Sequence, residues 1–443
     1  MRMRKSYVTI ILIVCGWSPI AWACPKLSGF YPEDTGMIQS WELARDNLAK
    51  IYDQCLRNSE YFALYGAAHL NSGGLGEAIE SLERALLLDP DNGAALIDYA
   101  DALLRDGQLF AAIEANTLLL ARTDVPPDLK LQIDQRQQNW AALTKQTSWQ
   151  LDLSGGYDDN LNGAPDEDLV ELTLSGEPIF LSLKEQYKAV EGEFLNARLQ
   201  ARHRRLTPDF QHSFIGQIRS RVSDDASSDV AQLAGRYNRL KATGRNSLEW
   251  GAGVNHLIFG NRSLFTGTDF GGRYQLGSIG RCRSQSEVAL QHQVWHQQRR
   301  LDGLEAKVGV GASCPLSSEM DHRLNLEGSI LHNSELSGDR LGGDREGWQV
   351  SANWQMTLPL GSLLAQFNYT RLIDESGFNA LLASNARRAV KRSSLLIQFR
   401  RAFDLVGSNG QLVMSFYHQN QRSNLGLFQT QDTSAEIGLS WRF

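Results

Sequence analysis

The chain ends in the stretch Ala435-Glu436-Ile437-Gly438-Leu439-Ser440-Trp441-Arg442-Phe443, in which apolar side chains alternate with polar residues or glycine. The same alternation occurs in residues 195–202 and 304–312. Successive side chains of a β-strand point to opposite faces, so each stretch predicts a strand with one apolar and one polar face. Such a strand fits a sheet that separates an apolar phase from water.

Segments of this kind recur from Trp149 to the C-terminus, each followed by a turn signal, and aromatic residues gather near their ends, as in the interfacial girdles of membrane barrels. Beyond the N-terminus no apolar run reaches the roughly 18 residues that a transmembrane helix needs. A closed barrel is the other structure that satisfies every backbone group in lipid. We therefore expect an antiparallel transmembrane β-barrel of about 14 strands. The expected strand starts are near Trp149, Lys188, Phe210, Ser228, Asn246, Ser263, Arg281, Leu301, Asp321, Arg345, Gly361, Arg387, Gln411 and Asp432.

The connections between these strands are expected to alternate in length. Residues 158–187 and 375–386 form long connections, whereas residues 207–209 and 243–245 form tight turns. Bacterial barrels carry long loops outside the cell and short turns in the periplasm. The pattern therefore predicts that both ends of the barrel lie on the periplasmic side of an outer membrane.

The segment before the barrel is expected to be helical, since residues 35–145 are rich in Ala, Leu, Glu and Arg with apolar spacing near 3.6. Residues 58–92 repeat after about 34 residues, which is the tetratricopeptide period. Helices near 38–56 and 128–144 would cap the stack, because isolated repeats cannot bury their apolar faces. Small residues are expected where paired helices touch, at Gly66, Ala78, Ala100 and Ala112.

The N-terminus predicts export. A basic start and a short apolar run precede Ala21-Trp22-Ala23, which fits a signal-peptidase site. We expect a signal peptide at 1–23, a periplasmic tetratricopeptide-like domain at 24–146 and an outer-membrane barrel at 147–443. Lipidation of Cys24 is the alternative, although the two residues before Ala23 depart from the usual lipidation motif.

Four cysteines remain after removal of the signal peptide, and an even number in an oxidising compartment favours disulfides. In the expected register, Cys282 begins one strand and Cys314 ends the next at the same end of the barrel. A bridge between these two is geometrically reasonable. Cys24 and Cys55 are then the second pair.

Charged residues on the polar face of the strands are expected to point into the lumen. Large barrels have polar interiors in any case, so mixed charge is first a structural requirement. The functional interpretation is a lumen that admits a polar polymer or an unfolded segment. The lumen-facing candidates are Arg198, Arg202, Glu305, Arg323, Glu327, Arg400 and Glu436.

The first long connection contains the acidic residues Asp158, Asp159, Asp166, Glu167 and Asp168. Such a group of carboxylates could bind calcium, which favours oxygen ligands. The alternative is a solvated extracellular loop. Alternation around Gly176-Glu177 also predicts a small hairpin within this connection.

Catalysis and nucleic-acid binding are not expected. The sequence lacks the H-E-x-x-H, G-x-S-x-G and C-x-x-C motifs. A net charge of −6 disfavours nucleic acid as a partner. No cofactor or metal is assigned, and the expected surroundings of the barrel are the outer-membrane lipid bilayer.

The helical repeats, residues 155–165 (Gly-Gly-Tyr-Asp-Asp-Asn-Leu-Asn-Gly-Ala-Pro) and the final Trp441-Arg442-Phe443 together resemble the surface lipoprotein assembly modifier family. The terminal aromatic residue also resembles the signal that the barrel-assembly machinery recognises. The family resemblance implies a periplasmic repeat domain, a barrel of fourteen strands and a role in bringing lipoproteins or related proteins to the cell surface. It assigns no functional residue.

Two other functions remain open from the sequence. Exopolysaccharide export porins also join tetratricopeptide repeats to a C-terminal barrel, and their client is a polysaccharide. A general porin with an accessory periplasmic domain is the third possibility. Each of the three is a transport protein, and they differ in what crosses the membrane.

Overall fold

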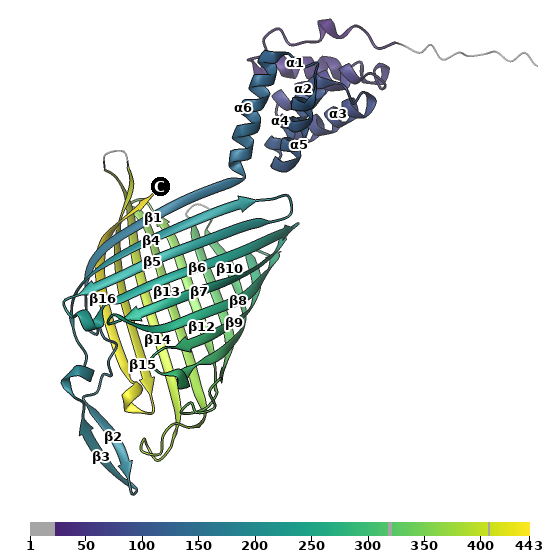
Figure 1. The fold of residues 1–443 in the computed structure, drawn as a ribbon. Coiled ribbons are helices and arrows are strands. Elements are labelled where there is room, and N and C mark those ends of the chain that lie inside the picture. Colours follow the sequence, from purple (N-terminus) through teal and green to yellow (C-terminus); the bar gives the residue numbers. More distant parts are fainter. Residues whose placement is uncertain (1–22, 318–320, 406–407) are drawn as a thin grey trace, which may run out of the picture. The chain divides into compact units, whose positions relative to one another are not determined.

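The structure is a computed structural model that describes residues 23–317, 321–405 and 408–443. It divides between Leu143 and Thr144 into two compact units, one helical and one formed by strands (Figure 1). The expected signal peptide at 1–23 lies outside the described residues except for Ala23.

The helical unit contains two antiparallel helix pairs flanked by single helices. Asn58 and Asn92 occupy equivalent places in the two pairs, and each side chain accepts a hydrogen bond from a backbone N–H in the first turn of the next helix. Such caps satisfy donors that a helix start leaves free. No helix among the described residues is long and apolar enough to cross a bilayer. The helices are α1 (Ile38–Ala49), α2 (Ser59–Asn71), α3 (Leu75–Leu88), α4 (Gly93–Arg105), α5 (Leu109–Ala121) and α6 (Pro127–Leu143).

Close packing within the pairs depends on small residues. A Cβ atom on Gly66 would lie 2.5 Å from Cγ of Leu82, so the α2 backbone lies directly against α3. Ala78, Ala100 and Ala112 are fully buried. Each of the four residues expected to pack between helices therefore lies in the core of this unit.

The N-terminal segment is attached to this core by a disulfide between Cys24 and Cys55. Cys55 follows a short 3-10 helix, Tyr52–Gln54, and is buried. The first expected helix, 38–56, is therefore shorter in the structure, because the chain turns after α1. Tyr61 fills the space beneath this turn, and its hydroxyl donates to the carbonyl of Leu48 at 2.9 Å.

The second unit is a closed antiparallel barrel of 14 strands, as expected, in which β1 pairs with both β4 and β16 (Figure 1). Its strands are β1 (Lys145–Asp158), β4 (Gly192–Leu206), β5 (Gln211–Ser223), β6 (Val230–Thr243), β7 (Asn246–Phe259), β8 (Arg262–Ile279), β9 (Cys282–Trp295), β10 (Gly303–Ser317), β11 (His322–Glu335), β12 (Arg345–Leu358), β13 (Gly361–Gly377), β14 (Arg387–Leu405), β15 (Ser408–Ser423) and β16 (Thr430–Arg442).

The strand starts follow the sequence expectation closely, with the largest differences at the first two strands. β1 begins at Lys145 rather than near Trp149, and it pairs with β4 from its first residue. Residues 145–148 are polar on both faces of the strand, so alternation could not identify them. The disulfide between Cys282 and Cys314 joins the adjacent strands β9 and β10.

The barrel has two different ends, which we call the short-turn end and the long-loop end. Both β1 and β16 have their outer termini at the short-turn end, beside the β4–β5 turn. At the long-loop end, the expected hairpin is formed by β2 (Leu169–Leu174) and β3 (Glu177–Ser182). The N–H of Thr173 in β2 donates to the carbonyl of Leu381 at 2.8 Å, which connects the hairpin to the β13–β14 loop.

The outer face of the barrel is apolar. Leu195, Val310 and Ile330 are 70%, 68% and 66% exposed, although each belongs to a regular strand. A continuous apolar surface of this kind would be costly in water, whereas it is the expected surface of a barrel in lipid. The second unit is therefore a transmembrane β-barrel.

Candidate functional site in the barrel interior

The inner face is identified by contacts that cross over a strand. The amide of Asn196 on β4 lies 3.5 Å from the carboxylate of Glu436 on β16, with β1 between them. Arg221 on β5 likewise reaches Asp158 on β1 at 2.9 Å across β4. Side chains two strands apart converge only on the concave side of a curved sheet. These residues therefore project into the barrel.

A group of charges surrounds one interior cavity. Asp152 accepts from Arg198 at 2.7 Å, and Glu436 accepts from the hydroxyl of Ser154 at 3.0 Å. These side chains, together with Arg400, line a cavity of about 540 Å³. Three of the residues expected in the lumen, Arg198, Arg400 and Glu436, are thus brought together by strands from both ends of the sequence.

A second interior group lies on β8 to β11. The ammonium group of Lys307 lies 3.2 Å from Glu287 and 2.8 Å from Glu327. Arg273 pairs with Glu287 at 2.7 Å. Alternating signs on neighbouring strands neutralise one another, so this wall of the barrel carries charge without a large excess of either sign.

The remaining lumen candidates are less closely connected. Glu305 lies 3.5 Å from the amide of Asn333. Arg202 stands opposite Ser148 and Arg323 opposite Gln355, both toward the short-turn end, and both side chains are exposed. Arg323 is 3.7 Å from Asp321 in the adjoining turn.

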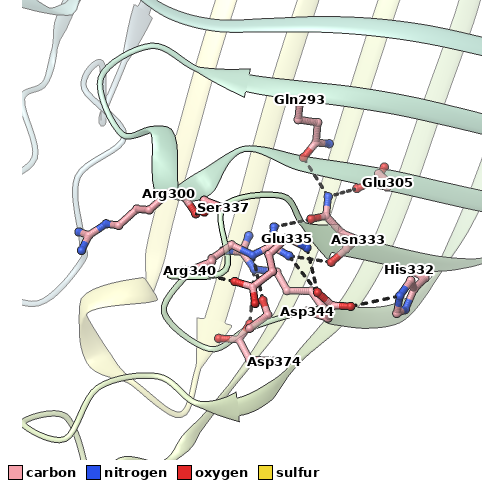
Figure 2. Close-up of polar contacts among 12 residues, drawn as sticks. Gln293, Arg300, Glu305, His332, Asn333, Glu335, Ser337, Arg340, Asp344 and Asp374 are labelled. Carbon is pink, nitrogen blue, oxygen red and sulfur yellow. Dashed lines mark hydrogen bonds and ion pairs between the residues drawn. The ribbon is translucent and has the colours of Figure 1, made fainter.

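At the long-loop end, residues 336–344 fold against the interior side of β11. Figure 2 shows Arg340 directed at Asn333, and its guanidinium donates to the side-chain oxygen of Asn333 at 2.5 Å and to the Asn333 carbonyl at 2.7 Å. The side chain of Arg340 is 1% exposed. Asn333 also donates to Gln293 at 2.9 Å, so the loop is tied to the inner wall over three strands.

A buried ion pair between two neighbouring strands lies beneath other loops at this end. Asp374 on β13 is 2% exposed and lies 3.1 Å from Arg388 on β14. The Arg388 guanidinium also lies 4.6 Å from the centre of the Phe378 ring and 4.5 Å from that of Phe428. Phe378 and Phe428 belong to the loops that follow β13 and β15. Movement of these loops would therefore remove the two rings from the buried Arg388 guanidinium and expose its ion pair with Asp374.

The acidic connection does not gather as one group. Asp158 and Asp159 lie with Asp432 of β16, their carboxylate oxygens within 4.8 Å of one another. Asp168 instead lies 3.7 Å from Lys188. Asp158 and Asp159 were expected in an acidic group, whereas Asp432 joins them from the far end of the sequence. Arg221, which pairs with Asp158, offsets part of its negative charge.

The helical unit has its own partly buried polar network. Arg136 on α6 donates to Asn116 at 2.9 Å and lies 4.8 Å from the centre of the Trp140 ring. Burial lowers the pKa of Arg136 and raises the pKa of Asp98 on α4 to about 6. Asn116 is fully buried within α5. The network ties the last helix to the second repeat.

A comparison with known protein families agrees with the helical-repeat part of this architecture. The tetratricopeptide repeat family matches residues 70–130. The chain is a transmembrane β-barrel preceded by helical repeats. A search of curated proteins found no match.

Several solved structures are similar to parts of the chain. The outer membrane channel DcaP of Acinetobacter baumannii is 12% identical, with 68% of this chain and 98% of that chain covered and a TM-score of 0.38. Pseudomonas aeruginosa OccK9 (OpdG) is 9% identical, with coverage of 68% and 100% and a TM-score of 0.36. The Yersinia enterocolitica type III secretion translocator chaperone SycD is 21% identical, with coverage of 26% and 82% and a TM-score of 0.23.

Proposed function

We propose that this protein is an outer-membrane translocation protein whose helical repeats bind a periplasmic client and whose barrel aids the passage or display of that client at the cell surface. The observation that carries the proposal is the joining, in one chain, of a tetratricopeptide-repeat unit to a transmembrane barrel with a charged interior. Repeat stacks bind partners along extended surfaces. A general porin would need only the barrel. The presence of the repeats is therefore the reason to infer a client.

The topology supports a periplasmic position for the repeats. β1 enters the barrel at the short-turn end, so the preceding segment starts on that side of the membrane. Bacterial barrels direct short turns to the periplasm. The barrel-assembly machinery would then insert the barrel from the periplasmic side, using the C-terminal strand.

The long-loop end supports controlled passage rather than free diffusion. Arg340 holds residues 336–344 against β11, and Arg388, paired with Asp374, contacts Phe378 and Phe428 in two other loops. Opening would have to exchange these contacts for water or for a client. We therefore infer that the loops move when a client that was bound from the periplasm passes through the barrel.

The proposed client is a protein, with a surface lipoprotein as the preferred class, and the experiment compares it with a polysaccharide. Deleting residues 58–126 should leave a barrel that still migrates differently on gels with and without heating. Surface proteins released by protease from intact cells would be quantified by mass spectrometry, and surface glycans by sugar analysis. We expect one or more lipoproteins to be lost from the surface while total cell content remains.

A matched deletion of residues 169–182, the β2–β3 hairpin, controls for general damage to the protein. If a surface glycan were lost while the surface proteins stayed unchanged, the client would be a polysaccharide and not a protein. Unchanged surface proteins and glycans in the repeat deletion would refute client capture by the repeats.

A further inference from the structure

Three basic residues form a row across the outer face of the barrel near the long-loop end. Arg371 on β13 stands opposite Lys391 on β14, and Lys391 stands opposite Arg422 on β15. All three side chains are exposed. The neighbour of Arg371 on the other side is Trp348, an outward-facing residue of β12 that is 40% exposed. The row therefore faces away from the lumen. It lies at the height of Trp348, where the membrane interface is expected.

These cations differ from the arginines on the inside of β14 and of the neighbouring β12. Arg345 and Arg388 are paired with Asp374 in the interior. In the described part of the chain, by contrast, no carboxylate forms an ion pair with Arg371, Lys391 or Arg422. Three adjacent positive charges repel one another, so a bound anion would stabilise the arrangement.

An apolar groove begins at this row. It has a volume of about 560 Å³ and is lined mainly by apolar residues such as Val308, Ile330 and Trp348, with Arg371 and one carboxylate, Glu346, also in its wall. Ala306 contributes only a methyl group to the lining, which leaves the groove open. The groove lies on the lipid-facing side, because Val308 and Ile330 are outward-facing and exposed. An acyl chain of a lipid is therefore the expected occupant of this groove.

We propose that this surface binds a phosphorylated lipid of the outer leaflet, with an acyl chain in the groove and its phosphate groups on Arg371, Lys391 and Arg422. Charge complementarity favours phosphate, because Lys and Arg both donate charge-assisted hydrogen bonds to its oxygens. Basic pockets at a membrane interface bind anionic lipid head groups in the same way. The site is distinct from the lumen and independent of the client.

The test uses the full-length protein in detergent and native mass spectrometry with added lipids. The probes are diphosphorylated lipid A, the same lipid without its phosphates, and phosphatidylethanolamine. Wild-type protein should retain the diphosphorylated lipid at least tenfold better than the dephosphorylated form. Arg371→Gln/Lys391→Gln/Arg422→Gln should lose at least tenfold in affinity, since each basic residue near a membrane surface contributes a factor of about five.

The control replaces exposed outward-facing basic residues at the other end of the barrel, as Arg205→Gln/Lys241→Gln/Arg401→Gln. It should keep wild-type affinity within about twofold. Ala306→Phe fills the groove and should weaken binding of the acylated lipid with the basic row intact. Equal binding of phosphorylated and dephosphorylated lipid by the wild type overturns the proposal, whatever the variants do. An equal loss in both triple variants also overturns it.

Discussion

Trp149 and Phe443 exchange two backbone hydrogen bonds, from the Trp149 N–H to the Phe443 carbonyl at 3.0 Å and from the Phe443 N–H to the Trp149 carbonyl at 2.9 Å. The last residue of the chain thereby completes the seam between β1 and β16. The pairing continues from Gln150↔Arg442 to Asp158↔Ser434. Closure of the barrel therefore depends on residues at opposite ends of the sequence region that forms the strands.

Deleting Phe443 should impair assembly in cells more than it destabilises the finished barrel. The deletion removes two hydrogen bonds, each contributing about 1 kcal/mol, from a long seam. It also removes the terminal aromatic side chain. We expect the fraction of heat-modifiable protein in membranes to fall severalfold. Phe443→Tyr keeps the aromatic ring and should assemble normally, and normal assembly of the deletion would contradict the prediction.

Gly66→Ala should destabilise the helical unit by about 1–3 kcal/mol, because the new methyl group would overlap fully buried Leu82. Gly76→Ala is the matched control, since a Cβ there meets no atom within 4 Å and helices favour alanine. The control should be neutral or slightly stabilising. Thermal unfolding followed by circular dichroism at 222 nm distinguishes the two. Equal melting temperatures would refute this account of the α2–α3 contact.

The helical unit should lose stability between pH 4 and pH 7 through Asp98. Burial raises the pKa of Asp98 from 3.8 to about 6, so the folded state binds the proton more tightly. This contribution is complete below about pH 4 and is lost as the pH rises through 6. Asp98→Asn should therefore raise the free energy of unfolding by about 1–2 kcal/mol at pH 7, allowing for partial exposure.

The measurement for Asp98 is denaturant unfolding of the full-length protein at pH 4.5 and pH 7, followed at 222 nm. Glu114→Gln, an exposed carboxylate on α5, controls for the change in net charge. The Asp98 variant should show a flatter dependence on pH than either the wild type or this control. An unchanged pH dependence would argue against a raised pKa.

Arg340→Ala should release the loop at 336–344 from the inner wall of the barrel. The substitution removes the donors to Asn333 and Gly343, and it leaves buried acceptors without partners. We expect larger or more frequently fluctuating conductance in planar bilayers. Arg300→Ala is the control, because Arg300 is exposed and contacts Ser337 only through its backbone carbonyl. Identical traces for the Arg340 variant and the wild type would contradict a gating contact.

Replacing Cys24 and Cys55 by serine should lower the stability of the helical unit by about 3–4 kcal/mol, which is the loop-closure entropy expected for a separation of 31 residues. The variant Cys282→Ser/Cys314→Ser removes the other bridge and should leave the helical signal at 222 nm unchanged, because that bridge lies between two barrel strands. A helical transition altered equally by both variants would contradict separate roles for the two disulfides.

Local patterns predicted most of the architecture. Alternation between Leu304 and Ala312 identified β10, and the repeat of about 34 residues that relates Gly66 to Ala100 identified the helix pairs. The pairing of Cys282 with Cys314 followed from strand order alone. These features depend on neighbours in sequence or on adjacent strands, so a period of 2 or 3.6 residues is enough to find them.

Contacts between distant loops could not be predicted in this way. Arg340 and Asp374 are ordinary loop-end charges in the sequence, and only the folded loops bury them. Asp432 joins Asp158 because the barrel closes. The row of Arg371, Lys391 and Arg422 likewise requires the register of three strands.

The sequence by itself determined the two-part fold, the strand number and which face of each strand meets lipid, because these follow from side-chain alternation and helix periodicity. The tertiary structure decided which charges meet in the lumen, at the long-loop end and on the outer face. The physical reason is that a charged side chain interacts over a few ångströms in space, and closure of the barrel sets those distances independently of separation along the chain.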